Sequence, residues 1–319
     1  MSAGQTDQMW DVVIAGGGAA GLSAALTLAR ARRSVIVIDG GQPRNAPAES
    51  AHGLLGLEGV NPLVLLQRGR EEASSYGAQI ISAQVVESTV TDSGFEVTLD
   101  DGRVISARQL MIATGVIDEL PDVDGLAQRW GRDVVHCPYC HGWEIREKKI
   151  GLLAIGPMSA MQALLFHQWS DSVQFFTQGL EFSDEELERL AAVGIAVTTE
   201  PVIGIDVSRD QLSGVRLRDG EFIDLDALAV PALTRARTEG FDSLGLEIST
   251  TPAGTTIVAD ALGHTSIPGV WSAGNAVNPG MQVSEAAANG ARVAMTVNTE
   301  LVFEDADRAV AGNRTAVSR

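Results

Sequence analysis

Residues 11–21 of this 319-residue chain read DVVIAGGGAAG, an apolar run that leads directly into a turn rich in glycine. The helical pattern of Leu22–Arg32 follows, and Ser34–Ile38 forms a second apolar run that ends at Asp39. This alternation of short apolar runs with a helix predicts two parallel strands joined by a crossover helix. We therefore predict an α/β fold that begins with a βαβ unit.

The glycines of this turn have the spacing of a dinucleotide-binding loop. Gly16 allows the tight turn, Gly18 lets the backbone approach a pyrophosphate, and Gly21 allows the helix to pack closely on the sheet. The N-terminus of the helix favours the charge of the phosphates, and Asp39 can accept hydrogen bonds from an adenosine ribose. A glycine-rich turn without a ligand is the alternative, but the strand, the helix and the acid all occur in the expected order. The spacing does not distinguish FAD from NAD.

The rest of the chain predicts a β-meander insert in the first unit and then a second unit built on the same plan. Short β-branched runs at 84–91 and 95–99, followed by 104–105, predict an antiparallel meander, and a buried strand is expected at 110–113. The second unit is predicted from the strand Lys149–Ile155, the helix Ser159–Trp169, the strands Ser172–Thr177 and Ile195–Thr199, and a meander over residues 202–223. The chain is thus expected to form two Rossmann-like three-layer nucleotide-binding domains with antiparallel β-meander inserts.

Three smaller features complete this prediction. Ser183, followed by Glu186, has the pattern of a capping box and is expected to begin a helix. Residues 255–301 are expected to form a strand, a loop and a helix. Residues 308–319 are expected to form a frayed tail.

The bulk composition limits the kinds of partner. The net charge of −18, from 23 basic and 41 acidic residues, argues against nucleic acid or an anionic membrane as a partner. Residues 12–29 carry no charge, a length that suggests a membrane helix, but the four glycines within them make a turn instead. The start of the chain has no basic segment of the kind that opens a signal peptide. We expect a cytoplasmic protein.

Cys137 and Cys140 are the only cysteines, and they stand together in the sequence CPYC. This spacing lets the two sulfurs form and break a disulfide, which exchanges two electrons. Zinc is the rival interpretation because His136 and His141 flank the pair. Adjacent residues do not easily face one tetrahedral ion, however, and the sequence has no second CxxC. We therefore predict a redox pair and no metal.

Three further stretches identify a family. Residues 112–115 read IATG, residues 267–275 read IPGVWSAGN, and residues 281–284 read MQVS. Together with the glycine turn and the cysteine pair, in this order, they make the chain resemble the low-molecular-weight thioredoxin reductase family over nearly its whole length. The resemblance implies FAD as the prosthetic group and a homodimer. It also implies a discontinuous FAD-binding domain, residues 1–116 and 247–319, and a degenerate NADPH-type domain, residues 117–246, that carries the cysteine pair.

By the glycine spacing and this resemblance together, one set of residues is expected to bind FAD. These residues are Gly16, Gly17, Gly18, Ala19, Ala20, Gly21, Asp39, Gly40, Gln42, Arg44, Asn45, His52, Val86, Ala113, Thr114, Gly115, Gly274, Asn275, Gln282 and Val283. Asn275 stands where the family usually has an acid that bonds the ribityl chain of the flavin, and an amide can still make one such bond.

The second domain departs from the family pattern. Its nucleotide loop reads AIGPMSA over residues 154–160, so it keeps only Gly156, and Pro157 removes a backbone donor. Residues 176–179, after the next strand, read FTQG and contain no arginine for a 2′-phosphate. These changes predict a domain that keeps its fold and has lost NADPH chemistry. A divergent loop that still binds NADPH weakly is the alternative.

Residues 137–144 read CPYCHGWE, which is similar to FAD-dependent dithiol oxidases that close disulfides in natural products such as gliotoxin, holomycin and romidepsin. This similarity implies that a small-molecule dithiol delivers electrons through the cysteine pair to FAD, and that molecular oxygen removes them as hydrogen peroxide. One alternative is an NADPH-dependent thioredoxin reductase-like disulfide reductase that acts on a protein partner. Another is a redox-sensing FAD-binding protein.

The histidines beside the cysteines are the expected acid–base groups. Thiol exchange needs a thiolate, but a free cysteine has a pKa of about 8.5. A histidine, with a pKa of about 6.5, can take a proton from the thiol and return it. We expect His141 to have this catalytic role, with His136 as the second candidate. Cys137 is expected to receive the substrate thiolate, because by resemblance it lies farther from the flavin than Cys140.

Overall fold

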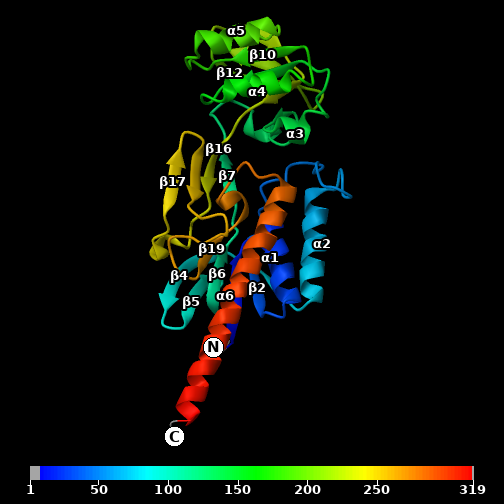
Figure 1. Cartoon of the computed structure of the whole chain (residues 1–319). Coiled ribbons are helices and arrows are strands. Elements are labelled where there is room, and N and C mark those ends of the chain that lie inside the picture. Colours follow the sequence, from blue (N-terminus) through cyan, green and yellow to red (C-terminus); the bar gives the residue numbers. More distant parts are fainter. Residues whose placement is uncertain (1–7, 318–319) are drawn as a thin grey trace.

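The structure, a computed structural model, describes residues 8–317 of the chain. It consists of two α/β domains stacked end to end (Figure 1). Two antiparallel strands, β7 and β16, connect the domains, with Arg235 of β16 paired to Ile117 of β7. Among the described residues, no helix is both long and apolar enough to cross a membrane.

The first domain is built on a sheet that, within the described residues, has seven strands. Their order is β3-β2-β1-β6-β5-β4, and β19 pairs with β6 beside this path. The strands are β1 (Met9–Ala15), β2 (Val35–Asp39), β3 (Gln79–Ser82), β4 (Val85–Thr91), β5 (Gly94–Leu99), β6 (Val104–Ile112) and β19 (Val270–Ser272). The β1, β2, β3, β6 and β19 pairings are parallel, while β4, β5 and β6 pair antiparallel.

Three helices cover one face of this sheet, and a second, smaller sheet covers the other. The helices are α1 (Ala19–Arg30), α2 (Pro62–Ser75) and α6 (Val283–Val317), with α1 packed against both of the others. The smaller sheet has the order β17-β18-β16-β7. Its strands are β7 (Val116–Glu119), β16 (Leu233–Ala236), β17 (Ile248–Thr251) and β18 (Gly254–Ile257). The short helix η2 (Asp242–Leu244) packs on β4, and η3 (Gly274–Ala276) precedes α6.

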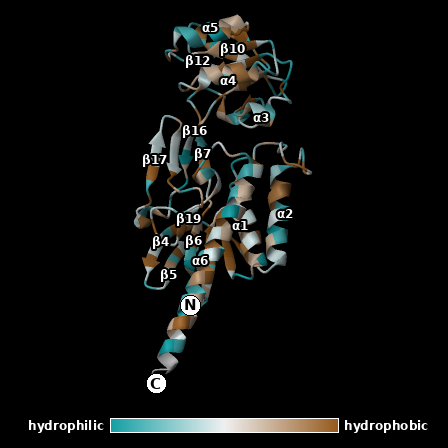
Figure 2. Cartoon of the chain, in the orientation of Figure 1, coloured by the Kyte–Doolittle hydropathy of each residue, from teal (hydrophilic) through white to brown (hydrophobic). Residues whose placement is uncertain are grey.

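The second domain repeats the three-layer plan on a smaller scale. Its parallel sheet has the order β11-β10-β9-β15-β8. The strands are β8 (Val134–Val135), β9 (Ile150–Leu153), β10 (Val173–Phe176), β11 (Ala196–Thr198) and β15 (Ala227–Ala229). The helices α4 (Ser159–Phe166) and α5 (Asp184–Ala192) bury their apolar sides in one core, and Figure 2 shows the apolar character of α4. The other face packs on the meander β12 (Val202–Ser208), β13 (Gln211–Leu217) and β14 (Phe222–Asp224).

The predicted fold class of two Rossmann-like three-layer domains with antiparallel β-meander inserts is confirmed. The predicted capping box is also present, because the Ser183 hydroxyl accepts from the Glu186 N–H and the Glu186 carboxylate accepts from the Ser183 N–H. The helix predicted from Ser159 is shorter than expected and ends at Phe166 instead of Trp169. Two remaining short helices, η1 (Ala127–Arg129) and α3 (Pro138–His141), flank β8.

Two element predictions are wrong. Residues 104–105 and 110–113 were expected in separate strands, but they belong to the single strand β6, which pairs with β5 along its first half and with β19 along its second. Residues 308–317 were expected to fray, but they continue α6. Alanine and arginine, which favour helices, make up half of residues 308–317, and Arg308 pairs with Glu304 one turn earlier. The last two residues of the predicted tail lie outside the described residues.

Candidate functional site

A cavity of about 550 Å³ lies where the first domain meets β8 and α3 of the second. Its wall includes the glycine turn, residues 16–20, and both cysteines of the CPYC sequence. The two features that the sequence analysis singled out therefore lie in one cavity, although more than 100 residues separate them in the chain. Both domains contribute residues to its wall.

The glycine turn is shaped for close backbone approach. Gly16 has a φ of +113°, and a Cβ at this position would lie 2.3 Å from the Ala113 carbonyl oxygen. A Cβ on Gly21 would lie 1.9 Å from the Gly16 carbonyl oxygen, so Gly21 lets α1 start tightly against the turn. A Cβ on Gly18 would meet nothing within 4 Å. Gly18 is the N-cap of α1 and offers no side chain to the first-turn N–H groups, which leaves them available to an anion.

Asp39 ends β2 next to this turn, and its carboxylate is held from two sides. One oxygen accepts from the Arg70 guanidinium at 2.6 Å, and the other accepts from the Gly41 N–H at 2.9 Å. Each carboxylate oxygen has further lone pairs, so Asp39 can still accept hydrogen bonds from a ribose. Gly17 makes this arrangement possible, because a Cβ there would lie 2.3 Å from the Asp39 carboxylate.

Arg44 is anchored to the strand that leads into the second domain. Its Nη2 and Nε donate to the two carboxylate oxygens of Asp118 at 2.6 and 2.9 Å. Its Nη1 donates to the Pro279 carbonyl at 2.8 Å. This bidentate pair neutralises the charge of Arg44, so the side chain forms a fixed part of the cavity wall.

Most of the residues expected to bind FAD line the cavity. They are Gly16, Gly17, Gly18, Ala19, Ala20, Asp39, Gly40, Gln42, Arg44, Asn45, His52, Ala113, Thr114, Gly115, Asn275, Gln282 and Val283. Gly21, Val86 and Gly274 do not line it, although Val85 does. Gly21 packs behind the turn, Val86 is half exposed, and Gly274 lies against Ala20.

Four charged residues of the wall were not predicted from the sequence: Arg70, Asp118, Arg237 and Glu239. Arg70 comes from α2, a helix that was not predicted. Its start carries a readable signal, because the Asn61 side chain accepts from the N–H groups of residues 63 and 64, and Pro62 holds the first helical position. Arg237 follows β16 and donates to the Gln42 carbonyl at 3.0 Å. No sequence motif marks it.

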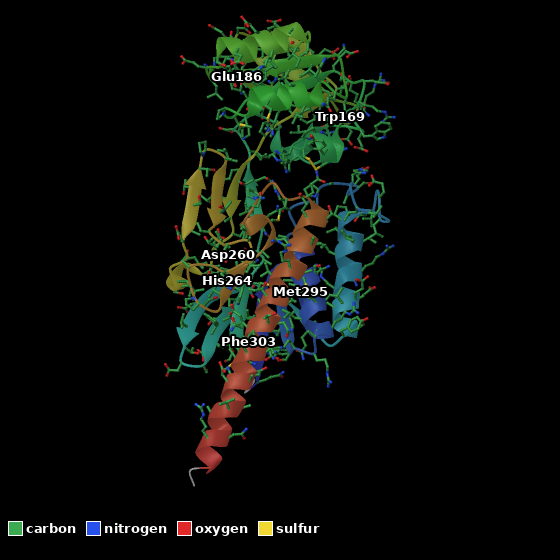
Figure 3. All side chains as sticks on the ribbon, viewed as in Figure 1. Trp169, Glu186, Asp260, His264, Met295 and Phe303 are labelled. Carbon is green, nitrogen blue, oxygen red and sulfur yellow. A yellow bond between two sulfur atoms is a disulfide. The ribbon has the colours of Figure 1, made fainter. Side chains whose placement is uncertain are left out.

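Cys137 and Cys140 form a disulfide at the start of α3, with their Cα atoms 5.2 Å apart. The Cys140 N–H donates to the Cys137 sulfur at 3.2 Å. Behind them α3 packs against Trp169, which Figure 3 labels beside this helix. A Cβ on Gly142 would lie 2.6 Å from the Trp169 ring, so the glycine allows this close packing.

The two histidines beside the cysteines have different surroundings. The Nδ1 of His136 lies 3.2 Å from the Ala232 nitrogen and 3.4 Å from the Val230 carbonyl oxygen, so it either accepts from Ala232 or donates to Val230, depending on the tautomer. The Nδ1 of His141 is buried and has no hydrogen-bond partner among the described residues. Burial lowers the pKa of both side chains below the usual histidine value. Both rings are therefore held in the neutral form, and only His141 has a buried nitrogen free to accept a proton.

His52 lies at the boundary between the domains. Its Nδ1 is 2.6 Å from a carboxylate oxygen of Glu58, and its Nε2 is 3.4 Å from a carboxylate oxygen of Glu144. Glu58 is in the same loop of the first domain, whereas Glu144 follows α3 in the second. His52 thus links the first domain to the segment that carries the disulfide.

In the second domain, the loop that corresponds to a nucleotide-binding turn is hydrogen-bonded to the side chain of Ser159. The Ser159 hydroxyl accepts from the N–H groups of Ile155 and Gly156 at 3.1 and 3.3 Å. At the end of β10, the Gln178 side chain is bonded to both the N–H and the carbonyl of Val202. Two backbone donors of this loop are therefore already used by Ser159, and Gln178 at the end of β10 is bonded to β12.

The comparisons with known proteins agree on one family. Residues 10–290 match the family described as pyridine nucleotide-disulphide oxidoreductase. Thioredoxin reductase tcpT of Claviceps purpurea is 33% identical over 85% of this chain and 87% of its own length. Thioredoxin reductase sirT of Leptosphaeria maculans is 32% identical over 93% of this chain and 96% of its own.

Solved structures give the same picture. The crystal structure of HlmI has a TM-score of 0.92 at 39% identity, and the match covers 99% of this chain and 100% of that one. An oxidoreductase from Agrobacterium tumefaciens has a TM-score of 0.87 at 34% identity, over 93% of this chain and 99% of that one.

Proposed function

The chain belongs to the pyridine nucleotide-disulphide oxidoreductase family and is a flavin-dependent thiol/disulfide oxidoreductase, and from this premise we propose that it oxidises a small-molecule dithiol. The dithiol becomes an intramolecular disulfide, and molecular oxygen is reduced to hydrogen peroxide. One observation carries this proposal: the Cys137–Cys140 disulfide and the glycine turn line the same cavity. A flavin bound at the turn would therefore share a cavity with the cysteine pair and could take electrons from it without a nicotinamide.

FAD fits the residues of this cavity. The first-turn N–H groups of α1 suit its pyrophosphate, and the free lone pairs of Asp39 suit its ribose. The Asn275 amide N–H already donates to the carbonyls of Asn278 and Met281, so its oxygen is the group left for the ribityl chain. When bound, FAD supplies a two-electron acceptor for the cysteine pair and a donor to oxygen.

The protein's own groups carry out the thiol chemistry. A substrate thiolate attacks the Cys137 sulfur and displaces Cys140 as a thiolate. The second substrate thiol then attacks the mixed disulfide and leaves with the first as a cyclic disulfide. The net result is two new cysteine thiols for one oxidised dithiol, so atoms and electrons balance. The Cys140 N–H, which donates to the Cys137 sulfur, stabilises charge there as Cys137 leaves.

His141 is the base for this exchange. Its pKa is lowered by burial, so the ring is neutral near pH 7 and can accept a thiol proton at Nδ1. His136 is less suited, because backbone groups of Ala232 and Val230 already contact its Nδ1. We therefore assign the proton transfer to His141 and an orienting role to His136.

Two observations favour an oxidase over an NADPH-driven reductase. Ser159 occupies the amides that a pyrophosphate would need, and no basic residue follows β10 in residues 177–180. The relatives named as thioredoxin reductases support the thiol–disulfide chemistry, while the substrate and the acceptor are our proposal. A cytoplasmic location stays a prediction.

An anaerobic titration tests the function. The purified flavoprotein is mixed first with NADPH and then, in a separate sample, with the small dithiol dithiothreitol, and the flavin absorbance is followed. We expect bleaching by the dithiol alone, and recovery with hydrogen peroxide when air is admitted. Rapid bleaching by NADPH would instead establish the reductase. No bleaching by either reagent would favour the redox sensor.

We also propose that the protein is a homodimer, and α6 offers a surface for it. Four exposed apolar side chains of this helix, Met295, Val302, Phe303 and Val310, are spaced to lie on one side. The buried side chains of α6, such as Val293 and Val297, lie on the opposite side and pack into the first domain. Figure 3 labels Met295 and Phe303 on this helix.

A further inference from the structure

The proposed reaction requires protons to move as well as electrons. Oxidation of one dithiol to a disulfide releases two electrons and two protons, and reduction of oxygen to hydrogen peroxide consumes two of each. The two halves occur at different times, so a proton taken up in the cavity has to leave it and later be replaced. His141 is largely buried, and its free nitrogen has no contact with solvent. The site therefore needs a second group that connects His141 with the surface.

His52 lies in the right place for this connection. It lines the same cavity as His141 and both cysteines. Its side chain is 22% exposed, between the buried His141 and two more exposed carboxylates, Glu58 and Glu144. Burial is the main cause of the lowered pKa of His141, and the charges of Glu144 and His52 act on this pKa as well.

The contacts of His52 fix how it can carry a proton. Its Nδ1 lies 2.6 Å from the Glu58 carboxylate, and the Gly53 N–H holds the other oxygen of that carboxylate at 2.9 Å. An Nδ1–H bonded to Glu58 leaves Nε2 free to accept a proton, with the Glu144 carboxylate 3.4 Å away to stabilise the charge. Glu144 lies one turn after His141 in the chain, since its backbone N–H donates to the backbone carbonyl of His141 at 3.1 Å.

From this geometry we propose that His52, oriented by Glu58 and assisted by Glu144, carries protons between His141 and solvent. The inference rests on the proposed oxidase function and adds a residue to it. His52 belongs to the first domain, whereas the base that it would serve, His141, belongs to the second. His136 is less suited to this role, because backbone groups of both Ala232 and Val230 contact its Nδ1.

The test compares the wild type with His52→Gln in the flavin-loaded protein. Glutamine can keep a hydrogen bond at this position but cannot shuttle a proton. A matched control is His264→Gln, because His264 also lies between two carboxylates, Asp260 and Glu300, each at 2.9 Å, but does not line the cavity. Flavin reduction by dithiothreitol is measured anaerobically by stopped flow, with a pH indicator in weakly buffered solution to follow proton release.

We expect His52→Gln to slow flavin reduction about tenfold and to delay proton release in the flavin-loaded fraction of the variant, which its absorbance spectrum quantifies. Added imidazole should restore most of the rate, and His264→Gln should behave as the wild type. A wild-type rate in His52→Gln overturns the proton route. A slow rate that imidazole does not rescue also overturns it and assigns His52 a purely structural role. A wild-type protein that dithiothreitol fails to reduce overturns the oxidase function itself.

Discussion

At the scale of single residues, the two cysteines have distinct surroundings although they share one disulfide. Cys137 is the N-cap of α3 and accepts the Cys140 N–H, whereas Cys140 lies within the first turn. The proposed scheme assigns the substrate to Cys137 and the flavin to Cys140. Each assignment can be tested with a cysteine variant that still binds flavin, because neither sulfur is part of the glycine turn.

Cys140→Ser is expected to retain FAD and to lose electron transfer from dithiols to it. A serine hydroxyl cannot form the disulfide that the dithiol reduces, while the turn and Asp39 stay intact. The flavin spectrum reports retention, and anaerobic mixing with dithiothreitol reports reduction. Cys137→Ser, as the companion variant, should lose the same activity. Full turnover by Cys140→Ser would rule out the scheme.

His141→Gln is expected to slow dithiol-dependent flavin reduction about 100-fold at pH 7, because the variant has no base for the thiol proton. Burial lowers the pKa of His141, so the wild type should keep the neutral base, and its rate, below pH 6.5. Measured pH–rate profiles should show an acid limb in the wild type that is absent in the variant. An acid limb that survives in the variant would move the base to another group, such as His136.

The same pKa shift has a consequence for stability. The unfolded chain binds more protons than the native state between the lowered pKa of His141 and about 6.5, so stability falls as the pH drops through this window. His136 contributes in the same direction, because burial lowers its pKa too. The loss of melting temperature between pH 7 and pH 5 should therefore be smaller in His141→Gln than in the wild type.

At the scale of elements, the loop between β9 and α4 shows how a nucleotide turn can be replaced. One hydroxyl, that of the almost fully buried Ser159, satisfies two backbone N–H groups that a pyrophosphate would otherwise bind. The fold of the βαβ unit is retained because strand pairing and helix packing do not depend on that ligand.

Ser159→Ala is expected to destabilise the protein by about 1–3 kcal/mol, because it leaves two N–H groups in a half-buried loop without a partner. Urea unfolding followed by fluorescence measures this change. The exposed Ser74 of α2 provides the control, and Ser74→Ala should shift stability by about 0.5 kcal/mol at most. If Ser159→Ala proved neutral, solvent would be satisfying these amides, and the argument that the loop is closed to nucleotides would fail.

Some elements could be predicted from the sequence and others could not. The first βαβ unit and the capping box follow local rules, since period, glycine spacing and side-chain caps are properties of neighbouring residues. The resemblance to thioredoxin reductases rests on such local motifs and is confirmed by the relatives. The pairing of β7 with β16 joins residues more than 100 positions apart, and no local pattern encodes it.

The residues of the cavity wall also differ in whether the sequence could predict them. The turn at residues 16–20 was expected from its spacing and lines the cavity. Arg70 and Asp118 could not be expected, because each is defined by a partner far along the chain, Asp39 and Arg44 respectively. The link from His52 to Glu144 depends on how the two domains meet, which no single segment specifies.

At the scale of the whole molecule, the orientation of the domains decides what the site can do. The strands β7 and β16 carry the second domain so that its disulfide lines the cavity of the first (Figure 1). Two further contacts hold this arrangement: Gly131 lies against Pro47, and His52 reaches Glu144. In the proposed reaction, a substrate dithiol would therefore reach the cysteine pair in the same cavity that would hold the flavin.

The exposed apolar side of α6 indicates that this surface of the molecule binds a partner. This helix has 35 residues, about 52 Å at the usual rise, and its C-terminal part projects beyond the sheet (Figure 1). Phe303 is 67% exposed, Met295 57% and Val302 51%. Large apolar side chains gathered on one side of a helix mark an interaction surface, and a symmetric dimer would bury this side of α6 against its copy.

Phe303→Asp is therefore expected to convert a dimer into a monomer, because it would place a charge in an apolar interface without a partner. Light scattering coupled to size-exclusion chromatography measures the mass. The matched control is Phe222→Asp, which removes a half-exposed phenylalanine from the meander of the second domain and should leave the dimer intact. Retained flavin absorbance in both variants would show that each is folded. A wild-type protein that runs as a monomer, or a Phe303→Asp variant that stays a dimer, would remove α6 from the interface and leave its apolar side to another partner.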